Sequence, residues 1–247
     1  MKILLWFALV AAIVAAPCSA LTRVTYIGVL SEGKDIAGVF GTPGSLIGKS
    51  VTFSMTFDYS LGRTLPNGSG TLYGTNPTTL ETPGRSGVVT VGGTSYTIAG
   101  AHVEGYTFIK HGGSIYPDGF EHMFDSFNCP VEGCFSNNNY AESYIRANVS
   151  SRSPGFLSSS DPRQSVSYVP VIGDSAFGEF HIARLDPEIF NNVELAYGAF
   201  RPTSVVISSV PDAPTWSLIL VGFGLIGAVC RAEIKTEGLE RAAPHLR

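Results

Sequence analysis

The chain is poor in charge, since only 15% of its 247 residues are Asp, Glu, Lys or Arg. Between Leu21 and Val210 it carries 16 acidic and 11 basic residues, and the basic ones form no stripe. Proteins that bind nucleic acids need clustered Lys and Arg to neutralise phosphates. The composition therefore argues against nucleic acid as a partner.

Catalytic motifs are also lacking. There is no Gly-x-Ser-x-Gly nucleophile elbow, and Gly84-Arg85-Ser86-Gly87 fits a hairpin turn better. A glycosidase needs two carboxylates across a cleft, and a pair such as Glu104 and Glu179 stays open, although nothing singles it out. We expect no enzyme, no catalytic residue and no cofactor.

Metal-ligand patterns are weak. The body has four histidines, and its densest polar cluster comprises Asp118, Glu121, His122 and Asp125, with Asn137 to Asn139 further along. Oxygen-rich loops can hold calcium, but this spacing matches no established loop. We interpret the cluster as a chance result of many turns and expect no metal site.

The sequence contains no amphipathic helix of normal length, but period-2 alternation is clear. Val51, Phe53, Met55, Phe57 and Tyr59 share one face of a predicted strand. The other predicted strands are 24–30, 88–91, 95–98, 101–110, 143–149, 164–169, 176–183, 193–200 and 203–209. About nine or ten such strands predict an all-β fold, an antiparallel β-sandwich or jelly roll.

Turn signals separate these strands. Gly92-Gly93 marks a hairpin, and loops are expected at 66–68, 82–84, 116–119, 137–139 and 150–162. A single helical turn is expected at 186–190. Phe120, Phe124 and Phe127 could stack on sugars, but we favour a place for them in the core.

The N-terminus has the features of a secretory signal peptide. Met1-Lys2 is basic, Ile3 to Ala16 is apolar, and Pro17-Cys18-Ser19-Ala20 offers small residues for cleavage. We expect cleavage after Ala20. Pro17 stands where a lipoprotein signal needs a small residue, which disfavours lipidation of Cys18.

The C-terminal region holds an uncharged apolar run, Ser217 to Cys230, shorter than the roughly 20 residues of a typical membrane span. A buried core helix is the alternative. Trp216 at one edge, Arg231 at the other and closely spaced glycines favour the membrane. The run is apolar on all sides, whereas a helix at the surface of a domain is apolar on one.

The segment from Pro211 to Arg231 resembles the PEP-CTERM sorting signal of bacteria that make exopolysaccharide. The matching residues are Pro211, Asp212 in place of Glu, Trp216, Gly222, Phe223, Gly224 and Arg231. Ala213 replaces the second proline, and Arg231 stands in place of a cluster of arginines. A weaker resemblance covers 33–41, with the glycines of an opening common in such proteins.

This resemblance implies four parts of the chain: a signal peptide (1–20), an all-β secreted domain (21–209), the sorting signal with its hydrophobic helix (210–231) and a charged tail (232–247). It implies export through the Sec translocon, cleavage by signal peptidase, and an inner-membrane-anchored precursor. An exosortase-type enzyme would then process it for the cell surface or extracellular matrix, with exopolysaccharide as a possible partner.

Only two of the four cysteines lie in the body, Cys129 and Cys134, which flank Pro130 to Gly133. In an exported protein such a pair favours a small disulfide loop. A zinc site would need further ligands at suitable spacing, and no second Cys or His pair supplies them.

We therefore expect an exported, non-enzymatic cell-surface or matrix protein. One alternative is a secreted polysaccharide-binding or polysaccharide-degrading β-sandwich, which an ordered cleft with two facing carboxylates would favour. Another is a membrane-anchored periplasmic domain whose sorting signal is not processed.

Overall fold

The computed structural model describes residues 21–67, 70–76, 78–100, 102–112, 118–128, 141–153, 155–186, 188 and 191–210. They lie in one compact unit, Leu21–Val210. The predicted signal peptide, the Cys129 and Cys134 pair, the asparagines 137–139, the sorting signal and the tail lie outside the described residues. No helix among the described residues has the length and hydropathy to cross a bilayer.

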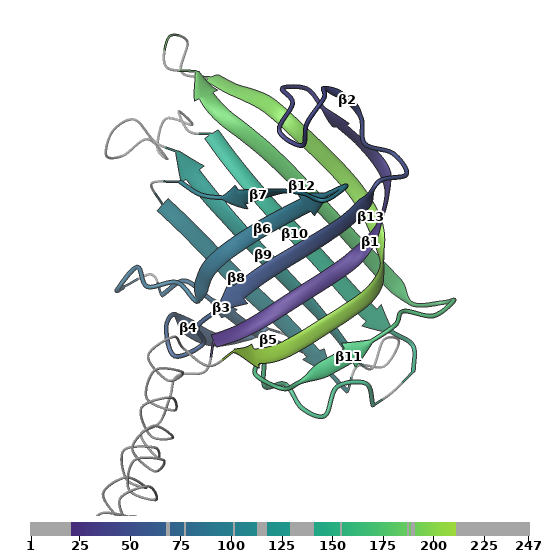
Figure 1. The fold of residues 1–247 in the computed structure, drawn as a ribbon. Coiled ribbons are helices and arrows are strands. Elements are labelled where there is room, and N and C mark those ends of the chain that lie inside the picture. The colour runs from purple at the N-terminus through teal and green to yellow at the C-terminus, as the bar shows by residue number, and fades with distance from the viewer. Residues whose placement is uncertain are drawn as a thin grey trace, which may run out of the picture. The chain divides into compact units, whose positions relative to one another are not determined.

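The described residues form an all-β fold, as predicted (Figure 1). Thirteen strands belong to one sheet, in which every pair of neighbours is antiparallel. The strands are β1 (Leu21–Asp35), β2 (Gly44–Ser45), β3 (Ser50–Phe57), β4 (Arg63–Asn67), β5 (Gly70–Gly74), β6 (Gly84–Val91), β7 (Thr94–Ile98), β8 (His102–His111), β9 (Asp118–Asn128), β10 (Ala141–Ser151), β11 (Val166–Tyr168), β12 (Ser175–Asp186) and β13 (Asn191–Val210).

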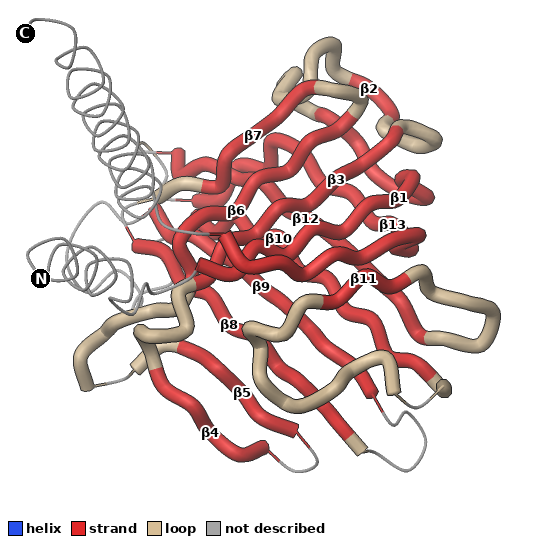
Figure 2. The backbone as a smooth tube through the Cα atoms, turned by 60° about the horizontal axis from the view of Figure 1, so that its bottom comes forward, coloured by secondary structure: helices blue, strands red, loops and turns tan. Residues whose placement is uncertain are grey.

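The strand order is β4-β5-β8-β9-β10-β12-β13-β1-β3-β6-β7, with β2 on β1 and β11 on β13. The sheet folds over itself, because β6 also contacts β8, β9 and β10, with which it does not pair. Figure 2 shows this curvature, with the β4–β5 hairpin at one edge. The arrangement is consistent with a β-sandwich whose two layers are halves of one sheet.

The core lies between the two layers. The predicted alternation in β3 is confirmed, since Val51, Phe53, Met55 and Phe57 are all fully buried. Phe53 packs edge-on against Phe200 of β13, with the ring centroids 4.8 Å apart. Burial of such side chains, worth roughly 1.5–3 kcal/mol each, supplies the main stabilisation of the domain.

One polar contact crosses this core. The hydroxyl of Tyr26 on β1 lies 2.7 Å from Nδ1 of His122 on β9, and it also donates a hydrogen bond to the carbonyl oxygen of Ala147. Both side chains are fully buried. Burial lowers the pKa of His122 to about 3, so the imidazole is neutral at pH 7.

The two layers approach each other closely at a pair of glycines. A Cβ on Gly105 of β8 would lie 2.6 Å from the Cα of Gly84 on β6. Real Cβ atoms do not approach a backbone atom so closely, so only glycine fits.

The predicted Gly92-Gly93 hairpin is confirmed. Strands β6 and β7 pair around it, and both glycines have positive φ, as a type I′ turn requires.

Several strands differ from the sequence prediction: β2, β5 and β9 were not predicted, and Gly84 to Gly87, assigned to a turn, begin β6. Residues 118–119, assigned to a loop, begin β9, because this strand pairs along its whole length with β8 and β10. Residues 66–67, also assigned to a loop, belong to β4, an edge strand that tolerates Pro66. The predicted strands 193–200 and 203–209 form one strand, β13, which passes Pro202 beside a register shift.

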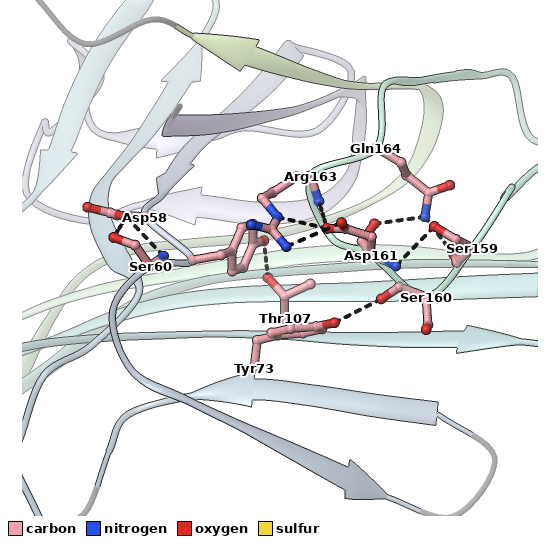
Figure 3. Close-up of polar contacts among 10 residues, drawn as sticks. Asp58, Ser60, Tyr73, Thr107, Ser159, Ser160, Asp161, Arg163 and Gln164 are labelled. Carbon is pink, nitrogen blue, oxygen red and sulfur yellow. Dashed lines mark hydrogen bonds and ion pairs between the residues drawn. The ribbon is translucent and has the colours of Figure 1, made fainter. Parts of the chain in front are cut away.

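The loop at 155–165, which precedes β11, makes polar contacts with β5 (Figure 3). The hydroxyl of Tyr73 on β5 donates a hydrogen bond to the carbonyl oxygen of Ser160, and the Gln164 amide donates to the carbonyl oxygens of Ser159 and Asp161. Leu157 is 1% exposed. Phe156 also packs edge-on against Phe120, so two side chains join the loop to the core. A loop was predicted at 150–162, but Ser150 and Ser151 belong to β10.

Both ends of the domain lie side by side, because Leu21 of β1 pairs with Val210 of β13. The helical turn predicted at 186–190 falls mostly outside the described residues. Within them, the backbone N–H of Glu188 donates a hydrogen bond to the carboxylate of Asp186, the last residue of β12.

Candidate functional site

The outer face of the layer formed by β8, β9, β10, β12 and β13 is acidic and aromatic. Alternation directs one set of side chains into the core and the other outward, and the register sets the outward positions in rows across the strands. We call this surface the acidic–aromatic face: Glu104, Tyr106, Glu121, Asp125, Glu142, Tyr144, Arg146, Phe177, Glu179, His181, Glu194 and Tyr197.

The outer face of the other layer has a different chemistry. Its central outward positions on β3, β6 and β7 are Thr52, Ser54, Thr56, Ser86, Val88, Thr90, Ser95 and Thr97. They form ladders of hydroxyl groups, such as the hydrogen bond of 2.8 Å between Thr90 and Ser95. None of these positions is charged, so the acidic–aromatic face is the chemically richer surface.

An open groove of about 310 Å³ lies on the acidic–aromatic face, between β10, β12, β13 and β1. The volume is at the lower end of the usual range for small-ligand sites. Its lining residues are Glu32, Tyr144, Phe177, Glu179, Phe180, His181, Glu194, Tyr197, Gly198 and Ala199. The small residues Gly198 and Ala199 leave the space that the larger side chains surround.

His181 organises one end of this groove. Its Nε2 lies 3.1 Å from a carboxylate oxygen of Glu194, and its Nδ1 lies 3.2 Å from the carbonyl oxygen of Glu142. The ring also stacks on Tyr144, with the centroids 5.7 Å apart. These contacts fix the imidazole against the strands, so the groove wall is ordered here.

Arg146 is engaged beside the groove. Its Nε donates a hydrogen bond of 2.7 Å to Glu121, which also accepts one from the hydroxyl of Tyr106. Burial raises the pKa of Tyr106, and the neighbouring Glu121 raises it further. Burial would lower the pKa of Arg146, but Glu121, which accepts its hydrogen bond, and Glu179, which lies directly across from it, raise this pKa overall.

Glu104 and Glu179, the carboxylate pair that the sequence left as a glycosidase candidate, do not face each other across a common cleft. Glu104 lines a second hollow of about 280 Å³, with Arg63 and Leu72 of the β4–β5 hairpin. Glu179 lines the groove. Their strands β8 and β12 are separated by β9 and β10, which puts them about 14 Å apart.

Asp125 is the strongest electrostatic outlier on this face. It is 7% exposed, its Oδ1 has no hydrogen-bond partner, and it lies directly across from Glu104. Burial, together with the neighbouring Glu104 and Glu142, raises its pKa to about 7. Such a carboxyl can hold a proton at neutral pH, but its burial keeps a substrate from reaching it.

The polar cluster 118–125 is split by strand alternation. Asp118 and His122 point inward, while Glu121 and Asp125 lie on the outer face. Asp118 accepts hydrogen bonds from His111 and from the backbone N–H groups of Gly155 and Leu157, so it anchors the closing loop. No three His, Cys, Asp or Glu side chains within the described residues converge as metal ligands would.

The aromatic candidates divide in the same way. Phe120 and Phe124 are almost fully buried, which confirms the favoured core interpretation. Phe127 differs, because it lies half-buried on the outer face opposite His102.

The sequence did not predict that the residues lining the groove lie together. One sequence feature could have indicated an outer face: every second position of 142–148 and 177–181 is polar or aromatic. The sequence does not show, however, that these two strands pair with each other.

Comparison with protein-family models finds no matching family, and comparisons with curated proteins and with solved structures find no match to this chain. Its function must therefore be argued from its own residues.

Proposed function

We propose that this protein is an exported, non-enzymatic component of the cell surface or exopolysaccharide matrix. The observation that carries the proposal is the C-terminal match to a sorting signal at Pro211, Trp216 and Gly222-Phe223-Gly224. The signal-peptide features before Leu21 support export from the other end.

The proposed route uses the Sec translocon and signal peptidase for export, the hydrophobic helix for anchoring, and an exosortase-type enzyme for release. The fold supports this division, because strand β13 ends at Val210 and Pro211 follows directly. Leu21 and Val210 pair, so the domain residues next to both proposed processing segments lie side by side.

The direct test is the intact mass of the protein recovered from each cell fraction. We expect a precursor in the inner membrane that lacks residues 1–20, and a shorter product, cleaved near Pro211, at the surface or in the matrix. Unprocessed protein confined to the cytoplasm would refute export. Anchored protein without the second cleavage would instead favour the membrane-anchored alternative.

A second candidate function is polysaccharide degradation, which one observation favours. Glu32 of β1 and Glu179 of β12 lie on opposite sides of Ala199 in register. The strands are about 10 Å apart, near the upper limit of the roughly 6.5–9.5 Å that inverting glycosidases use.

Exposure argues against this chemistry. Glu32 is exposed and Glu179 is half-exposed, whereas a glycosidase acid is buried so that its pKa rises. A reducing-end assay against matrix polysaccharide distinguishes the two functions. We expect no new reducing ends with the wild-type protein. Hydrolysis that is abolished by both Glu32→Gln and Glu179→Gln would make the protein an enzyme.

A further inference from the structure

Of the two hollows described above, the groove is the one in which aromatic side chains and several carboxylates converge around small residues. Ala199 lies at its centre, flanked in register by Glu179 on one strand and Glu32 on the other. Glu194 lies at the end held by His181. A ligand over Ala199 would therefore meet hydrogen-bond acceptors from more than one side.

Aromatic rings border the same space. Tyr197 is two residues before Ala199 on β13, and Phe177 is two residues before Glu179 on β12. Because these strands are antiparallel, the two aromatic residues lie on opposite sides of Ala199, each about 7 Å along its strand. Phe177 is 39% exposed, which is unusual for so large an apolar side chain. Rings placed in this way offer apolar faces on which the C–H face of a sugar can stack.

The charge of the groove selects among sugars. Three carboxylates line it, and the one imidazole is already 3.1 Å from Glu194. Arg201, on the neighbouring outward position of β13, donates its hydrogen bonds to the carbonyl oxygens of Val171 and Asp174. Two further cations border the groove: Lys34 lies opposite Tyr197, and Arg146, which is paired with Glu121, lies opposite Glu179. The three carboxylates outnumber these two cations, so a polyuronate would be repelled and an ammonium group attracted.

We propose that this groove binds amino-sugar units of a polysaccharide, with the free ammonium over Ala199 between Glu179 and Glu32 and neighbouring sugar rings stacked on Tyr197 and Phe177. The inference rests on the proposed function in taking a matrix polysaccharide as the ligand. Aromatic faces favour a cation over an anion as well, so stacking and charge act in the same direction.

The test is calorimetric titration of the full chain with three probes: a glucosamine hexamer, an N-acetylglucosamine hexamer and a galacturonate hexamer. We expect the glucosamine hexamer to bind most tightly, with an affinity that falls as salt is added. Glu179→Gln should weaken that binding about tenfold, the loss expected for one charge-assisted hydrogen bond. Phe177→Ala should weaken it several-fold.

The matched control is Glu104→Gln, which removes a carboxylate from the other hollow on the same face and should leave binding unchanged. Tighter binding of galacturonate, loss of binding in the control equal to that in Glu179→Gln, or binding of none of the three probes would overturn the proposal. A hexalysine peptide that binds more tightly than every sugar would assign the groove to a basic protein instead, and would also overturn it.

These outcomes are separable from those that test the proposed function. If the sugars do not bind but the cleaved protein is found in the matrix, only the groove assignment fails. If glucosamine binds but the protein is never exported, the matrix function fails and the binding site stands.

Discussion

Two buried carboxyl groups on β9 show how the surroundings of a residue set its charge. Burial would raise the pKa of Asp118, but hydrogen bonds from Leu157, Gly155 and His111 lower it overall. Asp125 lacks such donors at Oδ1, and burial raises its pKa to about 7. The two groups therefore affect stability in opposite directions as pH changes.

For Asp125, the folded pKa lies above the unfolded value of about 3.9. Its favourable contribution is complete below pH 4 and is lost as pH rises towards 7. Asp125→Asn should therefore stabilise the protein at pH 8 by about 2–4 kcal/mol, and the gain should vanish near pH 4. Urea unfolding of the full chain, followed by circular dichroism across this range, measures it.

Asp118→Asn is the matched control, because the same change is made seven residues away on the same strand, at an inward position. Its folded pKa is lowered, so its contribution is present above the unfolded pKa and is lost in acid. The substitution should destabilise the protein at pH 8. Equal effects of the two substitutions at pH 8 would show that their environments do not differ as described.

The cysteine pair gives a second prediction at this scale. Cys129 and Cys134 are the only cysteines between Leu21 and Val210, and Gly133 between them lets the chain turn. In the exported protein we expect them to be joined. Non-reducing peptide mapping of native protein should recover one cross-linked peptide, and two freely alkylated thiols would contradict the prediction.

At the scale of elements, the sequence correctly predicted those strands and turns that are determined by residues adjacent in the chain. The alternation of β3 and the Gly92-Gly93 hairpin were visible because an apolar face and a two-glycine turn leave their marks in adjacent residues. Strand β9 was missed because His122 and Ser126 occupy inward positions that an apolar pattern would reserve for hydrophobic residues. The buried imidazole of His122 is compensated by its contact with the hydroxyl of Tyr26 in the other layer. Residue spacing in the sequence cannot show a contact between layers.

The contact between β6 and β8 yields a further prediction. Gly105→Ala would place a Cβ 2.6 Å from the Cα of Gly84, so the two layers would have to separate. We expect a loss of about 1–3 kcal/mol, as for other overpacked sites. Gly74→Ala on β5 is the control, because its Cβ would meet its nearest atom, Cβ of Tyr106, at an ordinary 3.7 Å. Urea unfolding should show the loss in the first variant alone.

At the scale of the whole molecule, the candidate site depends on long-range register. Glu32 and Glu179 are far apart in sequence, and only the pairing of β1 and β12 with β13 brings them to either side of Ala199. Glu179 and His181 could be noted from the sequence, but nothing in it indicated Tyr197 or Glu194 as their neighbours. The proposed sorting signal differs from the groove, because its residues are contiguous and can be identified in the sequence without knowledge of the fold.

The most direct test of export and sorting is fractionation of cells that express the wild type and a variant with Pro211→Ala and Asp212→Ala, followed by blotting for the domain. The apolar run from Ser217 to Cys230 is untouched in this variant. We therefore predict that it stays anchored in the inner membrane, uncleaved at its C-terminal end, while the wild type is released. Release and trimming of the variant like the wild type would contradict the sorting signal and leave the segment as a simple membrane anchor.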